Sequence, residues 1–155
     1  MMKLNNRARN ILLALRVFLG ILFLYSGVSK LVEGFSAEGY LINATSGPFK
    51  EIFASMAGSG LVDSLVVYGE IGIGISLLLG FFLRFGALSG ALMMALFYLS
   101  ILPGEYGPID DHIIYILVFA LLAATGAGRY IGLDKYIEKL SFVKRSWGIF
   151  KFLLG

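Results

Sequence analysis

The sequence contains no cysteine and only one histidine, His112, among its 155 residues. Without cysteine the chain cannot form disulfides, thiolate zinc sites, iron–sulfur clusters or thiol redox motifs. A single histidine cannot ligate a haem from both faces, and we expect no metal, haem or iron–sulfur centre. Any redox chemistry must therefore use a bound small molecule or a partner subunit.

Charged residues are also scarce, at 15% of the chain, whereas hydrophobic residues make up 58%. Soluble domains have about 25% charged and roughly 45–50% apolar residues. A chain this short cannot bury such an excess in one core, so the expected environment is a lipid bilayer. The net charge of +3 does not indicate nucleic-acid binding, because the basic residues lie beside apolar runs, as in membrane proteins.

The apolar runs predict an all-α integral membrane four-helix bundle. Each run is close to the ~20 residues that cross a bilayer, and Arg84 divides the longest run in two. Arg16 interrupts the first run, which favours a spanning helix over a cleaved signal peptide. We predict a membrane domain over residues 11–132, with spans near 11–31, 65–83, 85–102 and 112–127.

Two segments outside the spans have helical patterns. In the first loop, apolar residues between Phe49 and Met56 predict a short surface helix. Residues 133–155 carry apolar side chains at every third or fourth position, namely Tyr136, Leu140, Val143, Trp147, Phe150 and Leu154. This pattern predicts one C-terminal amphipathic helix, which would lie on an anionic membrane surface or dock a partner.

Charge asymmetry predicts the topology. In a four-span arrangement only Lys30 and Lys50 fall on one side. The other side holds Lys3, Arg7, Arg9, Arg16, Arg84, Arg129, Lys135, Lys139, Lys144, Arg145 and Lys151. The basic side should be cytoplasmic, which places both termini in the cytoplasm and the protein in the plasma membrane.

Ionisable residues inside or at the edge of the spans are the candidate functional groups, because a charge in a bilayer costs free energy and is usually paired or functional. Glu70 lies in the second span and should pair with Lys30, near His112, Asp110 and Asp111. In one interpretation this is a structural ion pair that fixes helix register. In the other, Glu70, Lys30 and His112 are catalytic and the cluster binds a quinone headgroup and moves protons.

A second set of charges lies at the opposite membrane edge. Arg16, Arg84 and Arg129 are interpreted as anchors for lipid phosphates rather than catalysts, and Asp134 is grouped with them as a structural or lipid-facing charge.

Residues 16–30 (RVFLGILFLYSGVSK), and residues 68–74 (YGEIGIG) with 80–84 (GFFLR), form motifs in a fixed order and spacing. They resemble the opening helix and the second helix of the DoxX/DoxD family. Residues 109–115 (IDDHIIY) and 126–134 (GAGRYIGLD) resemble its fourth helix and closing motif. The sequences GYL and GPF, at 39–41 and 47–49, resemble the DoxD branch.

This resemblance implies a membrane subunit of thiosulfate:quinone oxidoreductase, which oxidises thiosulfate to tetrathionate and reduces quinone. In that enzyme DoxD is accompanied by a small subunit, DoxA. The resemblance therefore implies a separate DoxA-like or other redox subunit as partner.

Two other functions stay open at this stage. The chain could be a non-enzymatic scaffold or assembly factor that docks a partner through its outer loop or basic tail. It could also be a small-solute carrier, for which a homo-oligomer would be needed.

Overall fold

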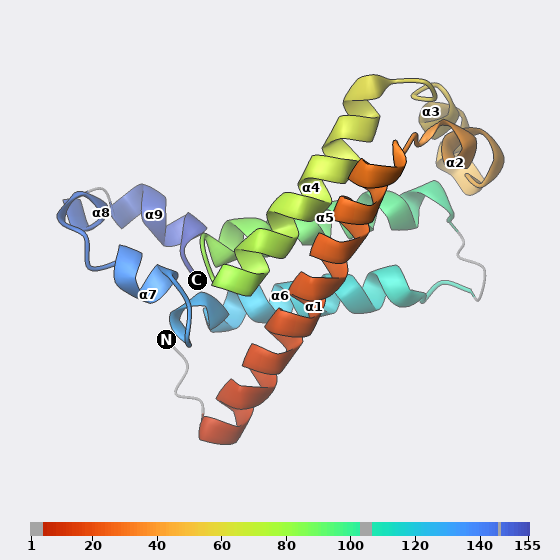
Figure 1. Cartoon of the computed structure of the whole chain (residues 1–155). Coiled ribbons are helices and arrows are strands. Elements are labelled where there is room, and N and C mark those ends of the chain that lie inside the picture. The colour runs from red at the N-terminus through yellow and green to blue at the C-terminus, as the bar shows by residue number, and fades with distance from the viewer. Residues whose placement is uncertain (1–4, 103–106, 146) are drawn as a thin grey trace.

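The computed structural model describes residues 5–102, 107–145 and 147–155, and in these ranges the regular secondary structure is entirely helical (Figure 1). Only an isolated bridge between Ser46 and Ile101 has β-type pairing there. Lys3 and residues 103–106, between the third and fourth predicted spans, lie outside the described residues.

The predicted spans are confirmed as helices. They are α1 (Asn6–Glu33), α4 (Gly60–Leu79), α5 (Leu83–Ser100) and α6 (Asp111–Thr125). The first three are long and apolar enough to cross a membrane, so the chain is a multi-pass membrane protein. Helix α6 is equally apolar but has 15 residues, or about 22 Å, which is shorter than the usual span of about 20 residues.

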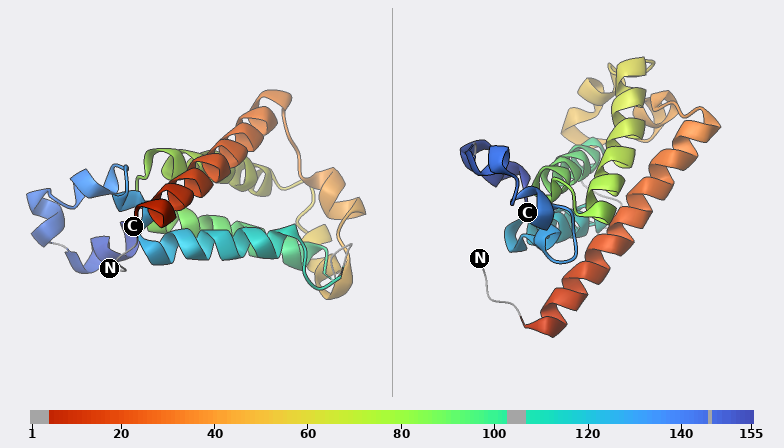
Figure 2. Two further views of the ribbon diagram at one scale, coloured as in Figure 1. Left: turned by 90° about the horizontal axis from the view of Figure 1, so that it is seen from below. Right: turned by 60° about the vertical axis from the view of Figure 1, so that its left-hand side comes forward.

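These four helices form two pairs that cross. Helix α1 packs along α4, α5 packs along α6, and the contact between α4 and α5 joins the pairs (Figures 1 and 2). Glycine permits the close approach within each pair. A Cβ atom on Gly74 would lie 2.6 Å from the backbone nitrogen of Leu24, and one on Gly90 would lie 2.3 Å from the Phe119 ring.

The loop between α1 and α4 is folded over one end of the bundle. It contains α2 (Glu38–Asn43), the 3₁₀ turn η1 (Gly47–Phe49) and α3 (Lys50–Ala54), so the expected surface helix is present and has a second helix beside it. The backbone N–H of Ser46 donates to the carbonyl of Ser100 at 2.8 Å. The first loop is therefore attached to the end of α5.

The tail is not the single amphipathic helix that its apolar spacing predicts. It contains α7 (Asp134–Ile137), α8 (Ser141–Arg145) and α9 (Trp147–Leu153), and the 3₁₀ turn η2 (Ala127–Arg129) precedes it. Helix α9 folds back onto α5, and the side chains of Val143 and Leu154 are fully buried. Part of the apolar stripe is thus used to pack against the bundle. Deleting residues 140–155 would remove this packing, so that truncation cannot cleanly test whether the tail docks a partner.

Candidate functional site

The bundle has an acidic end and a basic end. The acidic end contains the C-terminus of α1, the N-termini of α4 and α6, and the loop helices α2 and α3. The basic end contains the N-terminus of α1, the turn between α4 and α5, and residues 126–134 after α6, here called the closing segment. Residues predicted to be functional lie at both ends.

The predicted pair of Lys30 and Glu70 forms between α1 and α4. The Lys30 Nζ atom lies 2.6 Å from both carboxylate oxygens of Glu70 and 2.7 Å from the Ser26 hydroxyl. Glu70 is only 4% exposed. Because α4 begins at Gly60, Glu70 lies about 15 Å along the helix. A charge at this depth in an apolar helix requires its partner.

A cavity of about 160 Å³ adjoins the Lys30 side of this pair. Its polar lining comes from Lys30, Asp63, Ser64 and Tyr68, and Phe35 covers the ammonium with its ring centroid 5.5 Å from Nζ. The remaining lining residues are Leu31, Gly34 and Val67. Glu70 does not line the cavity and reaches it only through Lys30.

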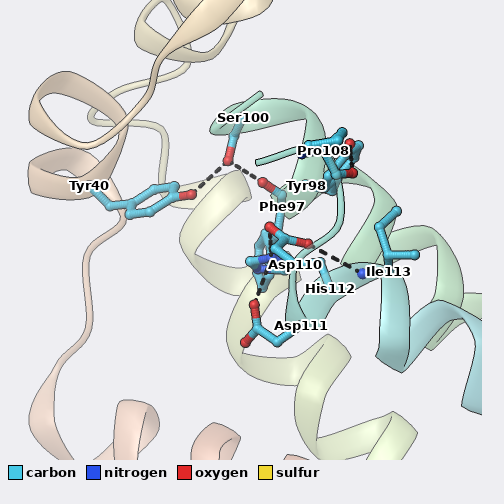
Figure 3. Close-up of polar contacts among 9 residues, drawn as sticks. All are labelled: Tyr40, Phe97, Tyr98, Ser100, Pro108, Asp110, Asp111, His112 and Ile113. Atoms are coloured by element: carbon cyan, nitrogen blue, oxygen red, sulfur yellow. Dashed lines mark hydrogen bonds and ion pairs between the residues drawn. The ribbon is translucent and has the colours of Figure 1, made fainter. Parts of the chain in front are cut away.

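His112 belongs to a separate polar group at the start of α6 (Figure 3). Its Nδ1 atom lies 3.0 Å from Asp110 Oδ2 and 3.4 Å from Asp111 Oδ1, and its ring meets Phe97 edge-on. Asp110 is the N-cap of α6, where its side chain accepts from the Ile113 N–H. The sequence placed His112 near Glu70, but among the described residues its ion pairs are with Asp110 and Asp111 and not with Glu70.

Tyr40 and Ser100 add a hydroxyl pair that sequence reasoning missed. The two hydroxyl oxygens lie 2.6 Å apart and connect α2 to the end of α5, beside the His112 group (Figure 3). Tyr40 lies within the GYL sequence that resembles the DoxD branch, and this was the only signal for it.

Within the described part of the chain, Asp110, Asp111 and His112 are also the residues whose potential metal-ligand atoms come closest, within 4.8 Å of one another. Asp110 is already used as a helix cap and Asp111 is exposed. Acidic groups in such positions are common at helix N-termini and do not by themselves define a metal centre.

At the basic end, Arg16 is not the lipid-phosphate anchor that its position predicts. It is 2% exposed and donates hydrogen bonds to three backbone carbonyls of the closing segment. Its Nη1 atom lies 2.8 Å from Ala127 O and 3.2 Å from Tyr130 O, and its Nη2 atom lies 2.8 Å from Ile131 O. Arg16 therefore fastens α1 to the segment that follows α6.

Asp134 has the matching role on the other side of that segment and is not lipid-facing, since it is fully buried. Its carboxylate accepts from the backbone N–H groups of Phe82 at 2.8 Å, Leu83 at 3.0 Å and Gly155 at 2.9 Å. Phe82 precedes α5 and has no side-chain cap, so Asp134 caps α5 from 51 residues away. Burial raises the pKa of Asp134, and these hydrogen bonds lower it part of the way back.

The other two basic-end arginines are partly exposed and also have protein partners. The Nε atom of Arg84 donates to Ala123 O at 3.1 Å, and Arg129 pairs with Glu138. Contact of these two residues with lipid phosphate stays a prediction.

The sequence model of the DoxX family matches residues 11–102. The chain belongs to the DoxX family. No curated protein and no solved structure matches it significantly. The DoxX match covers α1 to α5, and therefore Arg16, Lys30 and Glu70. It ends before His112 and Asp134, so their place in this DoxX protein rests on the geometry above.

Proposed function

We propose that this DoxX protein is the membrane subunit of a quinone-linked oxidoreductase, and that a quinone headgroup binds in the cavity beside Lys30. The observation that supports it is a buried carboxylate whose lysine partner lines a small cavity within an apolar helix pair. Pockets for whole small molecules are about 300–1,000 Å³, so this cavity of about 160 Å³ suits a headgroup alone. The exposed apolar surfaces of Leu31 and Tyr68 beside it would contact the isoprenoid tail in lipid.

Quinone reduction requires a proton donor in the site rather than a metal. Reduction of a quinone to a quinol consumes two electrons and two protons. An ammonium has three N–H donors. With one shared between the two Glu70 oxygens and one given to Ser26, Lys30 has a third for a quinone carbonyl oxygen. The Glu70 carboxylate accepts from the Lys30 ammonium and can exchange a proton with it.

At the acidic end, a further group of side chains takes protons from water. This group consists of His112, Asp110 and Asp111. His112 is the single histidine of the chain, and an imidazole can accept a proton at one ring nitrogen and donate one from the other. Its contacts with two carboxylates hold the ring at the N-terminus of α6.

The electrons come from outside the chain, because the sequence has no cysteine and no histidine pair to hold a redox centre. We propose a separate DoxA-like or other redox subunit, with thiosulfate as the donor to test first. Two thiosulfate ions then give one tetrathionate and two electrons, and these electrons with two protons convert one quinone to quinol. We also propose that the basic end faces the cytoplasm of the plasma membrane.

The decisive experiment follows thiosulfate-dependent reduction of a short-chain quinone by the full chain in lipid nanodiscs, co-expressed with neighbouring gene products. We expect E70Q to lower the rate at least about a hundredfold, the scale of general acid–base catalysis. Circular dichroism should show that the variant is still helical. The matched control is E51Q, which removes an exposed carboxylate from the acidic end and should leave the rate unchanged.

A double variant separates proton handling from a structural ion pair. K30Q/E70Q replaces the charged pair by two amides that can still hydrogen-bond, so it should restore any stability that E70Q loses. If the pair is only structural, the double variant regains quinone reduction. Full activity in E70Q, or no quinone binding with every partner present, would overturn the proposal and favour the scaffold.

A further inference from the structure

A second cavity lies at the basic end, far along α1 from Lys30, and has no part in the function proposed above. It measures about 150 Å³ and is lined by one face of α1 and by the closing segment. The α1 residues follow helical spacing, which brings them to one face. The lining residues are Asn6, Arg9, Asn10, Leu13, Tyr130 and Ile131.

The polar groups in this cavity are suited to an anion. Arg9 lies over the Tyr130 ring, with its guanidinium carbon 4.8 Å from the ring centroid. Among the described residues the Arg9 guanidinium makes this ring contact but no hydrogen bond, so its N–H groups are available. Asn6 and Asn10 add amide donors, and none of the described residues that line the cavity has a carboxylate. A planar guanidinium with amide donors is the usual protein partner of phosphate.

The position of the cavity indicates that the phosphate belongs to a lipid. Arg9 lies just before Ile11, where the apolar stretch of α1 begins, and therefore at headgroup level. Leu13 is one turn further into the bilayer, and the Ile131 side chain is 74% exposed. An acyl chain entering beside them would remain in an apolar environment, whereas a free phosphate would gain nothing from either residue.

The wall formed by the closing segment is held in one conformation. Ile131 has a φ of 53°, in the left-handed region that β-branched residues rarely adopt. Its carbonyl accepts from Arg16, and so does that of Tyr130. Because Arg16 is buried and makes these contacts inside the protein, it holds the backbone that carries Tyr130 and Ile131 beside Arg9.

We propose that this cavity binds the phosphate group of an anionic phospholipid, with Arg9, Asn6 and Asn10 as its donors and Leu13 and Ile131 against its acyl chain. The bound lipid would join α1 to the closing segment from outside, as Arg16 does from inside. This site is independent of the quinone proposal, and either can fail alone.

The test uses the full chain, delipidated in detergent, and native mass spectrometry with titration of dioctanoyl phosphatidylglycerol. Parallel titrations use dioctanoyl phosphatidylcholine, glycerol phosphate and inorganic phosphate. We expect selective binding of phosphatidylglycerol. R9Q should weaken it by about tenfold or more, as expected when a hydrogen bond to a charged group is lost. R7Q is the matched control, since Arg7 is an exposed arginine on the same helix that does not line the cavity.

Each alternative result has a definite meaning. Equal loss in R7Q and R9Q would show that anionic lipid is attracted only by the general positive charge of this end, and would overturn the site. Equal affinity for phosphatidylcholine would do the same. Tight binding of inorganic phosphate without preference for lipid would replace the lipid by a free anion. N10L provides a second variant of unchanged charge, and it should also weaken phosphatidylglycerol binding.

Discussion

Replacing Asp134 by asparagine should destabilise the protein although it exchanges one oxygen for an NH₂ group. The carboxylate uses Oδ1 for the Phe82 N–H, and Oδ2 for the N–H groups of Leu83 and Gly155. The least harmful amide orientation keeps oxygen at the Oδ2 position and turns NH₂ toward the Phe82 N–H. One buried donor is then left facing another donor, which costs about 1–3 kcal/mol.

The two hydrogen bonds that survive lose their charge assistance, at about 1 kcal/mol each. Removing a buried charge returns part of this loss, because burial disfavours the carboxylate and raises its pKa. The net destabilisation should be about 2–4 kcal/mol, combining these terms. For a chain of this size that corresponds to a fall in the unfolding midpoint of about 4–16 °C.

Thermal unfolding of wild type and D134N in one detergent, followed by circular dichroism, measures this difference. D63N is the matched control, because Asp63 accepts a single backbone hydrogen bond, from Ala37 N at 2.7 Å, through one oxygen. Asparagine can keep that bond, so D63N should lose less than about 1 kcal/mol. Hydrogen exchange should also accelerate at the amides of Phe82 and Leu83 in D134N. An unchanged midpoint in D134N, or an equal loss in D63N, would refute this account of Asp134.

Three further outcomes are expected. Arg16→Met should cost about 3–5 kcal/mol in thermal unfolding, since three buried carbonyls lose their donor, and R16K should recover only part of it. Gly90→Ala should cost about 1–3 kcal/mol, because its Cβ would meet the Phe119 ring, whereas Gly72→Ala has open space and should be neutral. Because the pKa of Asp134 is raised in the folded state, its contribution to stability is fully present below the ordinary carboxyl pKa of about 3.9 and is lost as pH rises through the raised value. The stability difference between wild type and D134N should thus be larger at about pH 4 than at about pH 7.

The main helices could be predicted because an apolar helix that enters lipid must satisfy its own backbone hydrogen bonds. Runs of apolar residues bounded by charges therefore give the positions of α1, α4, α5 and α6 to within a few residues. The tail could not be predicted in this way. Its three-and-four spacing is compatible with one long helix, but the burial of Val143 and Leu154 and the return of α9 to α5 depend on a turn that carries no strong sequence signal.

In the candidate site, too, some contacts could be predicted from the sequence and others could not. The pairing of Lys30 with Glu70 could be predicted, since two opposite charges in neighbouring spans have few other partners in lipid. The role of Arg16 could not, because its acceptors are backbone carbonyls more than a hundred residues away. Every residue has a backbone carbonyl, so the sequence does not show which carbonyls accept a hydrogen bond. An arginine at a membrane edge therefore has the same sequence pattern whether it binds lipid phosphate or its own backbone.

Glu70 and Asp134, the two buried carboxylates among the described residues, show how hydrogen-bond partners separate structure from chemistry. Asp134 accepts from backbone N–H groups alone, and a backbone amide cannot give up its proton or move without unfolding the chain around it. Glu70 is bound instead by the Lys30 ammonium, a side chain that can both rotate and transfer a proton. Lys30 is also partly exposed and borders a cavity, whereas Asp134 is fully enclosed. A carboxylate that must exchange protons with a ligand needs the second kind of environment, which is why the quinone proposal rests on Glu70 and Lys30 and not on the more deeply buried acid.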